Sequence, residues 1–211
     1  SAVLFDAPIA ASLLGSFVQA ISGGSLYKNL TFLDKSIDTK IFPDFVCIDE
    51  NPFLVGAMGS APFDQEGVKV KPRLVVENGI IRGYFLSSYS ARRLGMESTG
   101  NAGGSHNLRI FDKNNHNGKD LIEMFRLMGN GLFVTELMGQ GVNPITGDYS
   151  RGVSGFWIEN GKISFPVYEI TIAGNLKEMF RDIIAIGRDE YRRGSKTTGS
   201  VLIEKMTIGG S

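Results

Sequence analysis

The chain has 211 residues, enough to bury one sizeable hydrophobic core, and its 22 lysines and arginines are balanced by 22 aspartates and glutamates. A chain with no net charge lacks the field that holds a phosphate backbone, so we expect no nucleic-acid partner. The single cysteine, Cys47, cannot form an internal disulfide, and no apolar run approaches the roughly 18 residues needed to cross a bilayer. No secretory leader pattern opens the sequence, and we expect a soluble protein of the reducing cytoplasm, without membrane contact.

The first predicted element is a helix from Asp6 to Ile21. Its apolar residues recur near the spacing of one helical face, Asp6 is placed to cap its start, and Gly23-Gly24 is expected to end it. A short β-prone run follows at residues 45–48. Cys47 within that run is expected to be a small buried side chain rather than a nucleophile.

Residues 73–86 contain two β-rich runs joined by Asn78-Gly79, a pair that favours the type I′ turn of a β-hairpin. Apolar residues at positions i, i+3, i+4 and i+7 then predict a helix over residues 120–128, which glycines end. Residues 156–167 repeat the hairpin pattern around Asn160-Gly161. The two hairpins indicate an antiparallel sheet.

A further helix is predicted over residues 175–186, with Asn175 as its N-cap, and residues 201–208 are expected to form one closing strand. The basic cluster at residues 188–196 is interrupted by acids and is interpreted as a solvated loop. Hairpins interleaved with about three helices, without a regular βαβ rhythm, predict an α+β fold. We expect an antiparallel or mixed sheet in a single compact domain.

Three segments, residues 97–107, 135–141 and 146–152, are too polar and too rich in glycine to be expected in the core. Glycine lets another chain approach the backbone closely, and Thr, Asn, Asp and Ser offer short hydrogen-bonding side chains. The alternative interpretation is that each segment simply forms tight turns. Because three occur close together, we interpret them as a peptide-binding or interface surface. The candidate residues are Thr99, Gly100, Asn101, Gly103, Gly104, His106, Thr135, Glu136, Thr146, Gly147, Asp148, Ser150 and Arg151.

Three motifs follow one another along the chain: SSYSARRLGMESTGNAGGSHN at residues 87–107, TELMGQGVNPITGDYSRGVSGFWIENG at 135–161 and EITIAGNLKEMFRDI at 169–183. Together they resemble the C-terminal region of the TldD/PmbA family, and within it the PmbA branch, also called TldE. The resemblance implies an intracellular peptide-cleaving system in which a TldD-type subunit supplies zinc and a PmbA-type subunit pairs with it. It also implies that residues 1–211 are the C-terminal domain and that the family's N-terminal domain is absent from this chain.

Zinc hydrolysis needs at least three protein ligands, and the chain offers only two histidines and one cysteine, at separations that match no ligand pattern. The resemblance sharpens this conclusion. Members of the TldD branch carry a His-Glu-x-x-x-His segment where this chain has Phe5-Asp-Ala-Pro-Ile-Ala10, and a zinc-binding cysteine where residues 188–199 have none. We therefore expect no metal, no other cofactor and no catalytic residue in this chain, and we interpret Asp6 as a helix cap.

A serine nucleophile is also disfavoured, although Ser105, His106, Asp148 and Ser150 all lie in the polar segments. A catalytic triad requires serine, histidine and carboxylate to converge, and the adjacent Ser105 and His106 point in different directions on any regular backbone. The sequence contains no Gly-x-Ser-x-Gly elbow. Hydrolysis by serine is therefore the weakest of the hypotheses.

Two further side chains carry specific expectations. His116 lies among asparagines and a glycine, in a sequence typical of a turn, and should be inert. Glu136 lies in a strand-like run and is expected to be a half-buried acid paired with Arg151 or Arg109.

The resemblance and the missing ligands together favour a non-zinc subunit of a peptidase that cleaves unstructured peptides. Its polar segments would hold an extended peptide by strand addition, or be buried against a TldD-like partner, and the chain could form a homodimer when that partner is absent. A different class of function is a protein-binding adaptor without proteolytic activity, which fits the family's older description as a modulator of DNA gyrase. The third alternative is an autonomous hydrolase that needs no metal.

Overall fold

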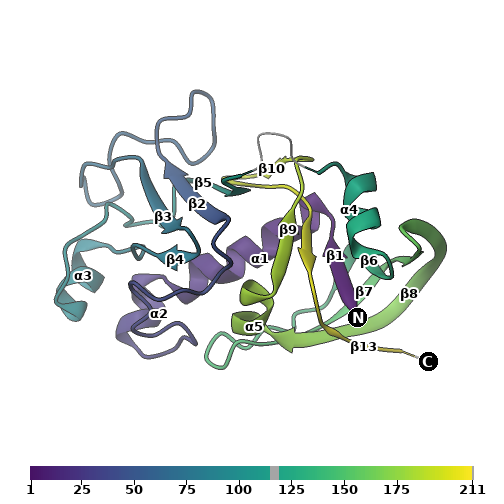
Figure 1. Cartoon of the computed structure of the whole chain (residues 1–211). Helices are drawn as coiled ribbons and strands as arrows, with labels where there is room; N and C mark the ends of the chain where they lie inside the picture. Colours follow the sequence, from purple (N-terminus) through teal and green to yellow (C-terminus); the bar gives the residue numbers. More distant parts are fainter. Residues whose placement is uncertain (115–118, 211) are drawn as a thin grey trace.

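Helix α1 (Ala7–Ala20) lies between two β-sheets in a computed structural model of the chain, which describes residues 1–114 and 119–210 (Figure 1). Across these residues, the strands form a seven-stranded and a six-stranded sheet, and four shorter helices accompany α1. The seven-stranded sheet has the order β13 (Thr207–Gly209), β8 (Lys162–Asn175), β7 (Asp148–Glu159), β6 (Gly131–Met138), β1 (Ala2–Phe5), β12 (Val201–Ile203) and β9 (Ile183–Ile186). The six-stranded sheet has the order β10 (Tyr191–Arg193), β11 (Lys196–Thr198), β5 (Asn107–Asp112), β2 (Val46–Asn51), β3 (Arg73–Glu77) and β4 (Ile80–Ile81). The other helices are α2 (Gly23–Tyr27), α3 (Ser88–Leu94), α4 (Leu121–Met128) and α5 (Leu176–Arg181).

The predicted α+β class is confirmed. Most strand pairs are antiparallel, while β1 pairs in parallel with β6, and β11 with β5, so the sheets are mixed as expected. Parallel neighbours require a crossover connection. The chain between β1 and β6 supplies one, because it contains α1 and then strands β2, β3, β4 and β5 of the six-stranded sheet. This crossover places α1 between the sheets.

The start of α1 follows the predicted chemistry. Asp6 accepts a hydrogen bond from the Ala7 N–H at 3.0 Å, and Pro8 stands in the first turn, where its missing N–H costs nothing. Burial raises the pKa of the Asp6 carboxyl above its usual value, while the Ala7 amide acts in the opposite direction and the nearby Asp189 adds to the rise. Asp6 is therefore a helix cap in a partly desolvated place.

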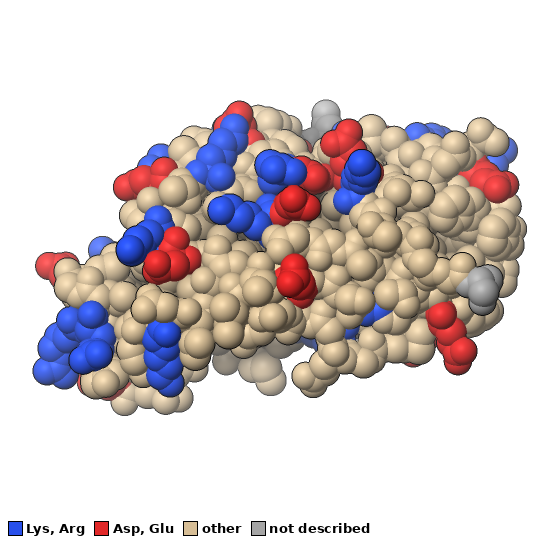
Figure 2. Space-filling view, turned by 90° about the horizontal axis from the view of Figure 1, so that it is seen from below, with Lys and Arg blue, Asp and Glu red and all other residues tan. Residues whose placement is uncertain are grey.

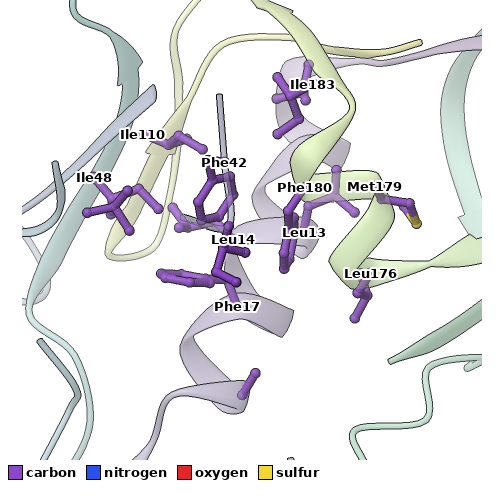
Figure 3. Packing of buried hydrophobic residues seen from close by; sticks show 14 of the residues in the cluster. Leu13, Leu14, Phe17, Phe42, Ile48, Ile110, Leu176, Met179, Phe180 and Ile183 are labelled. Atoms are coloured by element: carbon purple, nitrogen blue, oxygen red, sulfur yellow. The ribbon is translucent and has the colours of Figure 1, made fainter. Parts of the chain in front are cut away.

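The core is built where α1 and α5 meet the two sheets, and Figure 3 shows its side chains converging from these elements. The Phe17 ring lies 5.2 Å from that of Phe42 and 5.9 Å from that of Phe180, in edge-to-face contacts. Phe42 and Phe180 are themselves 5.0 Å apart. Aromatic rings at such separations add to the stabilisation that burial of their area already provides.

Both predicted hairpins form. Asn78 and Gly79 have φ values of 52° and 77°, and Asn160 and Gly161 have 51° and 73°, as a type I′ turn requires. Gly79 is needed for a second reason, because a Cβ there would lie 2.1 Å from the Phe42 carbonyl oxygen. The second hairpin is longer than predicted, since β7 and β8 extend back to Asp148 and on to Asn175.

Two predicted elements are wrong in part. The helix expected over residues 175–186 ends at Arg181, and Ile183–Ile186 form strand β9. Pairing with β12 buries Ile183 and Ile186, and this tertiary contact overrides a helical spacing that isoleucines also satisfy. The strand expected over residues 201–208 is divided between β12 and β13, which lie at different places in the seven-stranded sheet.

Two short helices were not predicted. Gly23-Gly24, expected to end α1, instead begin α2, with Ser22 as the cap. Helix α3 begins with a capping box between Ser87 and Ser90 and ends at Gly95, which has a left-handed φ of 66°.

The remaining predicted elements hold. Helix α4 is capped by Asp120 and ends at Gly129, and Cys47 on β2 is 5% exposed, a small buried side chain as expected.

Ser1 and Met206 exchange two backbone hydrogen bonds of 2.9 Å. No helix in the described part of the chain has both the length and the apolar character needed to cross a membrane.

The aromatic cluster gives a first test. Replacing Phe180 with Ala removes contacts to Phe17, Phe32 and Phe42 and should lower the free energy of unfolding by about 3–5 kcal/mol in urea denaturation. Tyr168→Ala is the control, because Tyr168 is 71% exposed and its removal should change stability by no more than about 0.5 kcal/mol. Equal losses for the two variants would contradict this packing.

Candidate functional site

The structure distributes the candidate residues over three places rather than one surface. Residues 99–106 pack at the ends of strands β2 and β3 and lead into β5, an interior strand of the six-stranded sheet. Glu136 and Arg151 line a cleft beside α1. Thr146, Gly147, Asp148 and Ser150 lie in and after the turn that leads into β7. We take the three places in this order.

A buried ion pair organises the first place. Glu50, at 2% exposure, accepts hydrogen bonds from Arg73 Nε at 2.7 Å, Asn101 Nδ2 at 2.8 Å and the His106 N–H at 2.8 Å. Asn101 Oδ1 in turn accepts from Arg73 Nη2 at 3.1 Å and from Thr99 Oγ1 at 2.7 Å. The expectation that this segment is too polar for the interior is wrong for Asn101 and His106, which are buried because the polar groups satisfy one another.

His106 is held by its ring as well as by its backbone. Nδ1 lies 3.1 Å from the Gly59 carbonyl oxygen and Nε2 lies 3.0 Å from that of Gly100. Both ring nitrogens therefore face backbone acceptors, and neither is placed to take a proton from a serine hydroxyl. The His106 ring is paired with these two carbonyls and not with Asp148 or Ser150, so His106 is not part of a catalytic triad.

Two glycines of this loop, Gly103 and Gly104, are exposed and border a cleft, whereas Gly100 is buried. Gly103 and Gly104 have φ values of 98° and 114°, which only glycine adopts readily. They line a cleft of about 510 Å³ opposite residues 58–65. Asp64 anchors that facing loop by accepting from the backbone N–H groups of Glu66, Val68 and Ala102.

The second place is a cleft of about 510 Å³ beside α1. The expected pairing of a half-buried Glu136 is wrong: the side chain is exposed, Arg109 pairs with Glu190 at 2.6 Å, and Arg151 Nη2 donates to the Gly139 carbonyl. Thr135 lies beside the cleft at a bulge in β6, where its hydroxyl faces the Ser154 carbonyl at 3.4 Å. The cleft is lined by Ile9, Ala11, Ser12, Gly15, Glu136, Leu137, Arg151, Arg193 and Lys196.

The third place is a hydrogen-bonded turn, the alternative that the sequence left open. Thr146 Oγ1 donates to Asp148 Oδ2 at 2.6 Å, and this bond, with a further one from Asn175, holds the pKa of Asp148 below its usual value. Gly147 has a φ of 82° and accepts from the Leu176 N–H at 2.7 Å. Ser150 is exposed and borders a shallow groove with residues 140–143.

Where the resemblance implies zinc ligands in the TldD branch, the residues of this chain do not fit a metal. Phe5 and Ala10 offer no ligand atom and are 0% and 1% exposed, and the matching segment near the C-terminal end places Thr198 in the core at 0%. Between Ala10, Thr198 and their apolar neighbours only about 10 Å³ is left open. Within residues 1–114 and 119–210, no three His, Cys, Asp or Glu side chains lie close enough to hold a metal ion. His116 lies outside the described residues.

Sequence reasoning missed several residues of these sites. Glu50 extends the apolar run of β2, and a charged residue at the end of a buried strand is the signal that could have suggested an internal partner. The cluster 188–196, interpreted as a solvated loop, includes the β10–β11 hairpin, which packs on α1 and brings Arg193 and Lys196 to the cleft. Only the tertiary contact with α1 distinguishes them from ordinary surface cations.

Comparisons with known proteins agree with one another. A family described as the PmbA/TldA metallopeptidase C-terminal domain matches residues 1–210. The chain is 50% identical over 208 residues to Metalloprotease PmbA of Escherichia coli O157:H7, which covers 99% of this chain and 45% of that protein. It thus spans about half the length of the curated relatives it matches.

Solved structures show the same relation. A Bacteroides thetaiotaomicron protein, described as a candidate modulator of DNA gyrase, superposes with a TM-score of 0.91 at 30% identity, covering all of this chain and 47% of its own. TldE from Thermococcus kodakarensis superposes with a TM-score of 0.83 at 26% identity, covering 99% of this chain and 50% of its own.

The buried network predicts an asymmetry between two ion pairs. Glu50→Gln places an amide against the donors of Arg73, Asn101 and His106, and leaves the Arg73 charge unpaired, so stability should fall by about 3–5 kcal/mol. Glu190→Gln, which breaks the exposed pair with Arg109, should cost no more than about 1 kcal/mol. Chemical denaturation measures both, and a similar cost for the two would refute a structural role for Glu50.

Asp64 predicts a pH dependence. Burial acts to raise its pKa, but hydrogen bonds from Ala102, Val68 and Glu66 hold the folded-state pKa below the ordinary value of 3.8. A depressed folded pKa contributes stability that is present above pH 3.8 and is lost as pH falls through the folded value. Asp64→Asn should therefore be less stable than the parent chain at neutral pH, and the difference should shrink in acid. A difference that stays constant from neutral pH into acid would contradict this origin.

Proposed function

This chain belongs to the PmbA/TldD metallopeptidase family, and we propose that it is the C-terminal part of a non-zinc, PmbA-type subunit in a peptidase that cleaves unstructured peptides. In this proposal a TldD-like partner supplies the zinc, and this subunit completes the substrate chamber and stabilises the assembly in the cytoplasm. The activity, the substrate and the partner belong to the whole protein, of which this chain corresponds to about half.

One observation carries the proposal: family membership is combined with apolar, buried side chains where the TldD branch holds its metal. Phe5 and Ala10 are both in the hydrophobic core, and Asp6 serves as a helix cap. A zinc site needs nitrogen, sulfur or oxygen ligands around an open position. Restoring one here would require removing core side chains, so this chain is better suited to support a catalytic partner than to act alone.

Exposed apolar residues support an assembly. Val55 is fully exposed, Met58 is 84% exposed and Phe63 is 58% exposed, all on the long connection between β2 and β3. A second apolar group, Ile163, Phe165 and Tyr168, lies on β8, where pairing with β13 reaches only residues 171–173. Large apolar side chains exposed in groups along the chain are consistent with regions covered by another polypeptide.

A protein-binding adaptor is the second candidate, favoured by the similarity to the Bacteroides protein described as a candidate gyrase modulator. Direct binding to DNA is disfavoured by the charge distribution. Figure 2 shows lysines and arginines mixed with aspartates and glutamates on the visible face, and its right-hand half carries few charges. A partner in this case would be a protein.

A reconstitution assay tests the proposal. The full-length parent of this chain, a TldD-like protein from the same organism, and a mixture of the two are each incubated with an unstructured peptide, with and without chelator. We expect cleavage that requires the partner, is strongest in the mixture and is abolished by chelator. Zinc analysis of each protein should find the metal with the partner only.

Two results would overturn the proposal. Cleavage by the parent protein alone would reveal an active site that the described residues do not explain. Stoichiometric, tightly held zinc in the isolated parent protein would reject a non-zinc subunit. Capture of gyrase without any TldD-like protein, together with no cleavage in the mixture, would favour the adaptor.

A further inference from the structure

The cleft beside α1 has a charge balance unlike that of the surrounding surface. Arg151 reaches it from β7, Arg193 from β10 and Lys196 from β11, and the single acidic side chain in its lining is Glu136. Three cations and one acid give the lining a net charge of +2 (3 − 1 = 2), in a chain with no net charge. A concave site with one sign of charge concentrates ligands of the other sign.

None of the three cations forms an ion pair with a residue in 1–114 or 119–210, whereas Arg73, Arg82, Arg109, Arg181 and Arg188 do. The Arg193 side chain donates a hydrogen bond to the Pro8 carbonyl at 3.4 Å and so extends across the first turn of α1. The Lys196 side chain lies along α1 next to Gly15, with its Cε 3.9 Å from where a Cβ of that glycine would stand. Their donors are available to a ligand in the cleft.

Arg151 carries the most specific signal. One of its terminal nitrogens donates to the Gly139 carbonyl, and its guanidinium lies close enough to the Tyr149 hydroxyl to act on the pKa of that group, against the larger and opposite effect of burial. Tyr149 lies two residues away on the same face of β7, and neither its hydroxyl nor Arg151 Nε has another hydrogen-bond partner among the described residues.

The cleft also has a definite position. Tyr149, the neighbour of Arg151 on β7, packs its ring edge-on to Phe5 at 6.5 Å, which fixes this part of β7 against the core. Its volume of about 510 Å³ falls within the range of small-molecule and peptide pockets. The apolar Ile9 and Leu137 form part of the wall and can contact a side chain next to a charged group.

We propose that this cleft binds a carboxylate group of a peptide through Arg151, Arg193 and Lys196. The inference rests on the proposed peptide-handling function and deepens it by naming the chemical class of substrate. Planar guanidinium groups bind carboxylates with paired hydrogen bonds, and an ammonium group adds a charge without fixed geometry. Ser12 and Glu136 then limit how the remainder of the peptide can lie, since both border the same space.

The test is equilibrium binding to the full-length parent protein, measured by fluorescence anisotropy without partner or cleavage. The probes are a short labelled peptide of Gly, Ser and Ala with a free C-terminal carboxylate, its C-terminally amidated twin, and an amidated twin with one internal Glu. We expect at least one of the two carboxylate probes to bind about tenfold more tightly than the uncharged twin, and that binding to weaken as salt is raised. The probe that binds identifies the source of the carboxylate.

Arg192 provides a matched control. It is on β10 next to Arg193 but points to the opposite face of the strand and is not part of the cleft lining. Arg193→Gln, Lys196→Gln and Arg151→Lys should each weaken binding of the carboxylate probe severalfold, while Arg192→Gln should leave it unchanged. Thermal unfolding of every variant establishes that it is folded.

The proposal is overturned if all three probes bind equally, or if the cleft variants behave like Arg192→Gln. These outcomes are separate from those of the reconstitution assay. Carboxylate-dependent binding without cleavage in the mixture would leave the cleft site standing and reject the peptidase role. Cleavage in the mixture with equal binding of all probes would do the reverse.

Discussion

The burial of α1 between two sheets is the constraint on which the rest of this structure depends. A helix covered on both sides must be apolar over most of its circumference, and α1 is, with Ala10, Leu13, Leu14 and Phe17 in the core. Only the strip that includes Ile9, Ser12 and Gly15 reaches a cleft. Helix α1 therefore acts as a packing element, and the charged side chains of the cleft come from the neighbouring strands.

A second feature is a group of polar side chains that are turned into the protein and bond to one another. The Glu50 network uses a carboxylate, a guanidinium, an amide and a hydroxyl to fasten the 99–106 loop, and every partner is supplied from within the chain. Such a network stabilises only when complete, because any unpaired member carries a desolvation cost. Arg151 is less completely satisfied, because its partners among the described residues are the Gly139 carbonyl and the Tyr149 hydroxyl, and it forms no ion pair there.

Local sequence signals predicted the elements whose conformation is determined by residues close together in the sequence. Asp6 as a cap, the Asn-Gly hairpin turns and the period of α4 could be read directly, since each is decided within a few residues. These signals failed where contacts between residues far apart in the sequence determine the structure. Ile183 and Ile186 fit a helix by spacing but pair with β12, and the polarity of Asn101 and His106 gave no indication that Glu50 lies beside them. Likewise, the cleft joins four segments from α1, β6, β7 and β10–β11, and no motif in a single segment describes it.

The backbone pairing of Ser1 with Met206 has a consequence for engineering. Two hydrogen bonds fasten the start of β1 to the segment between β12 and β13, so β1 is anchored independently of the connection between β2 and β3. That exposed connection could be lengthened around Val55 without breaking either sheet. A reporter inserted there would stand beside the apolar residues of the connection and would sense any polypeptide that covers them, while the bonds between Ser1 and Met206 would keep β1, and with it α1, in place.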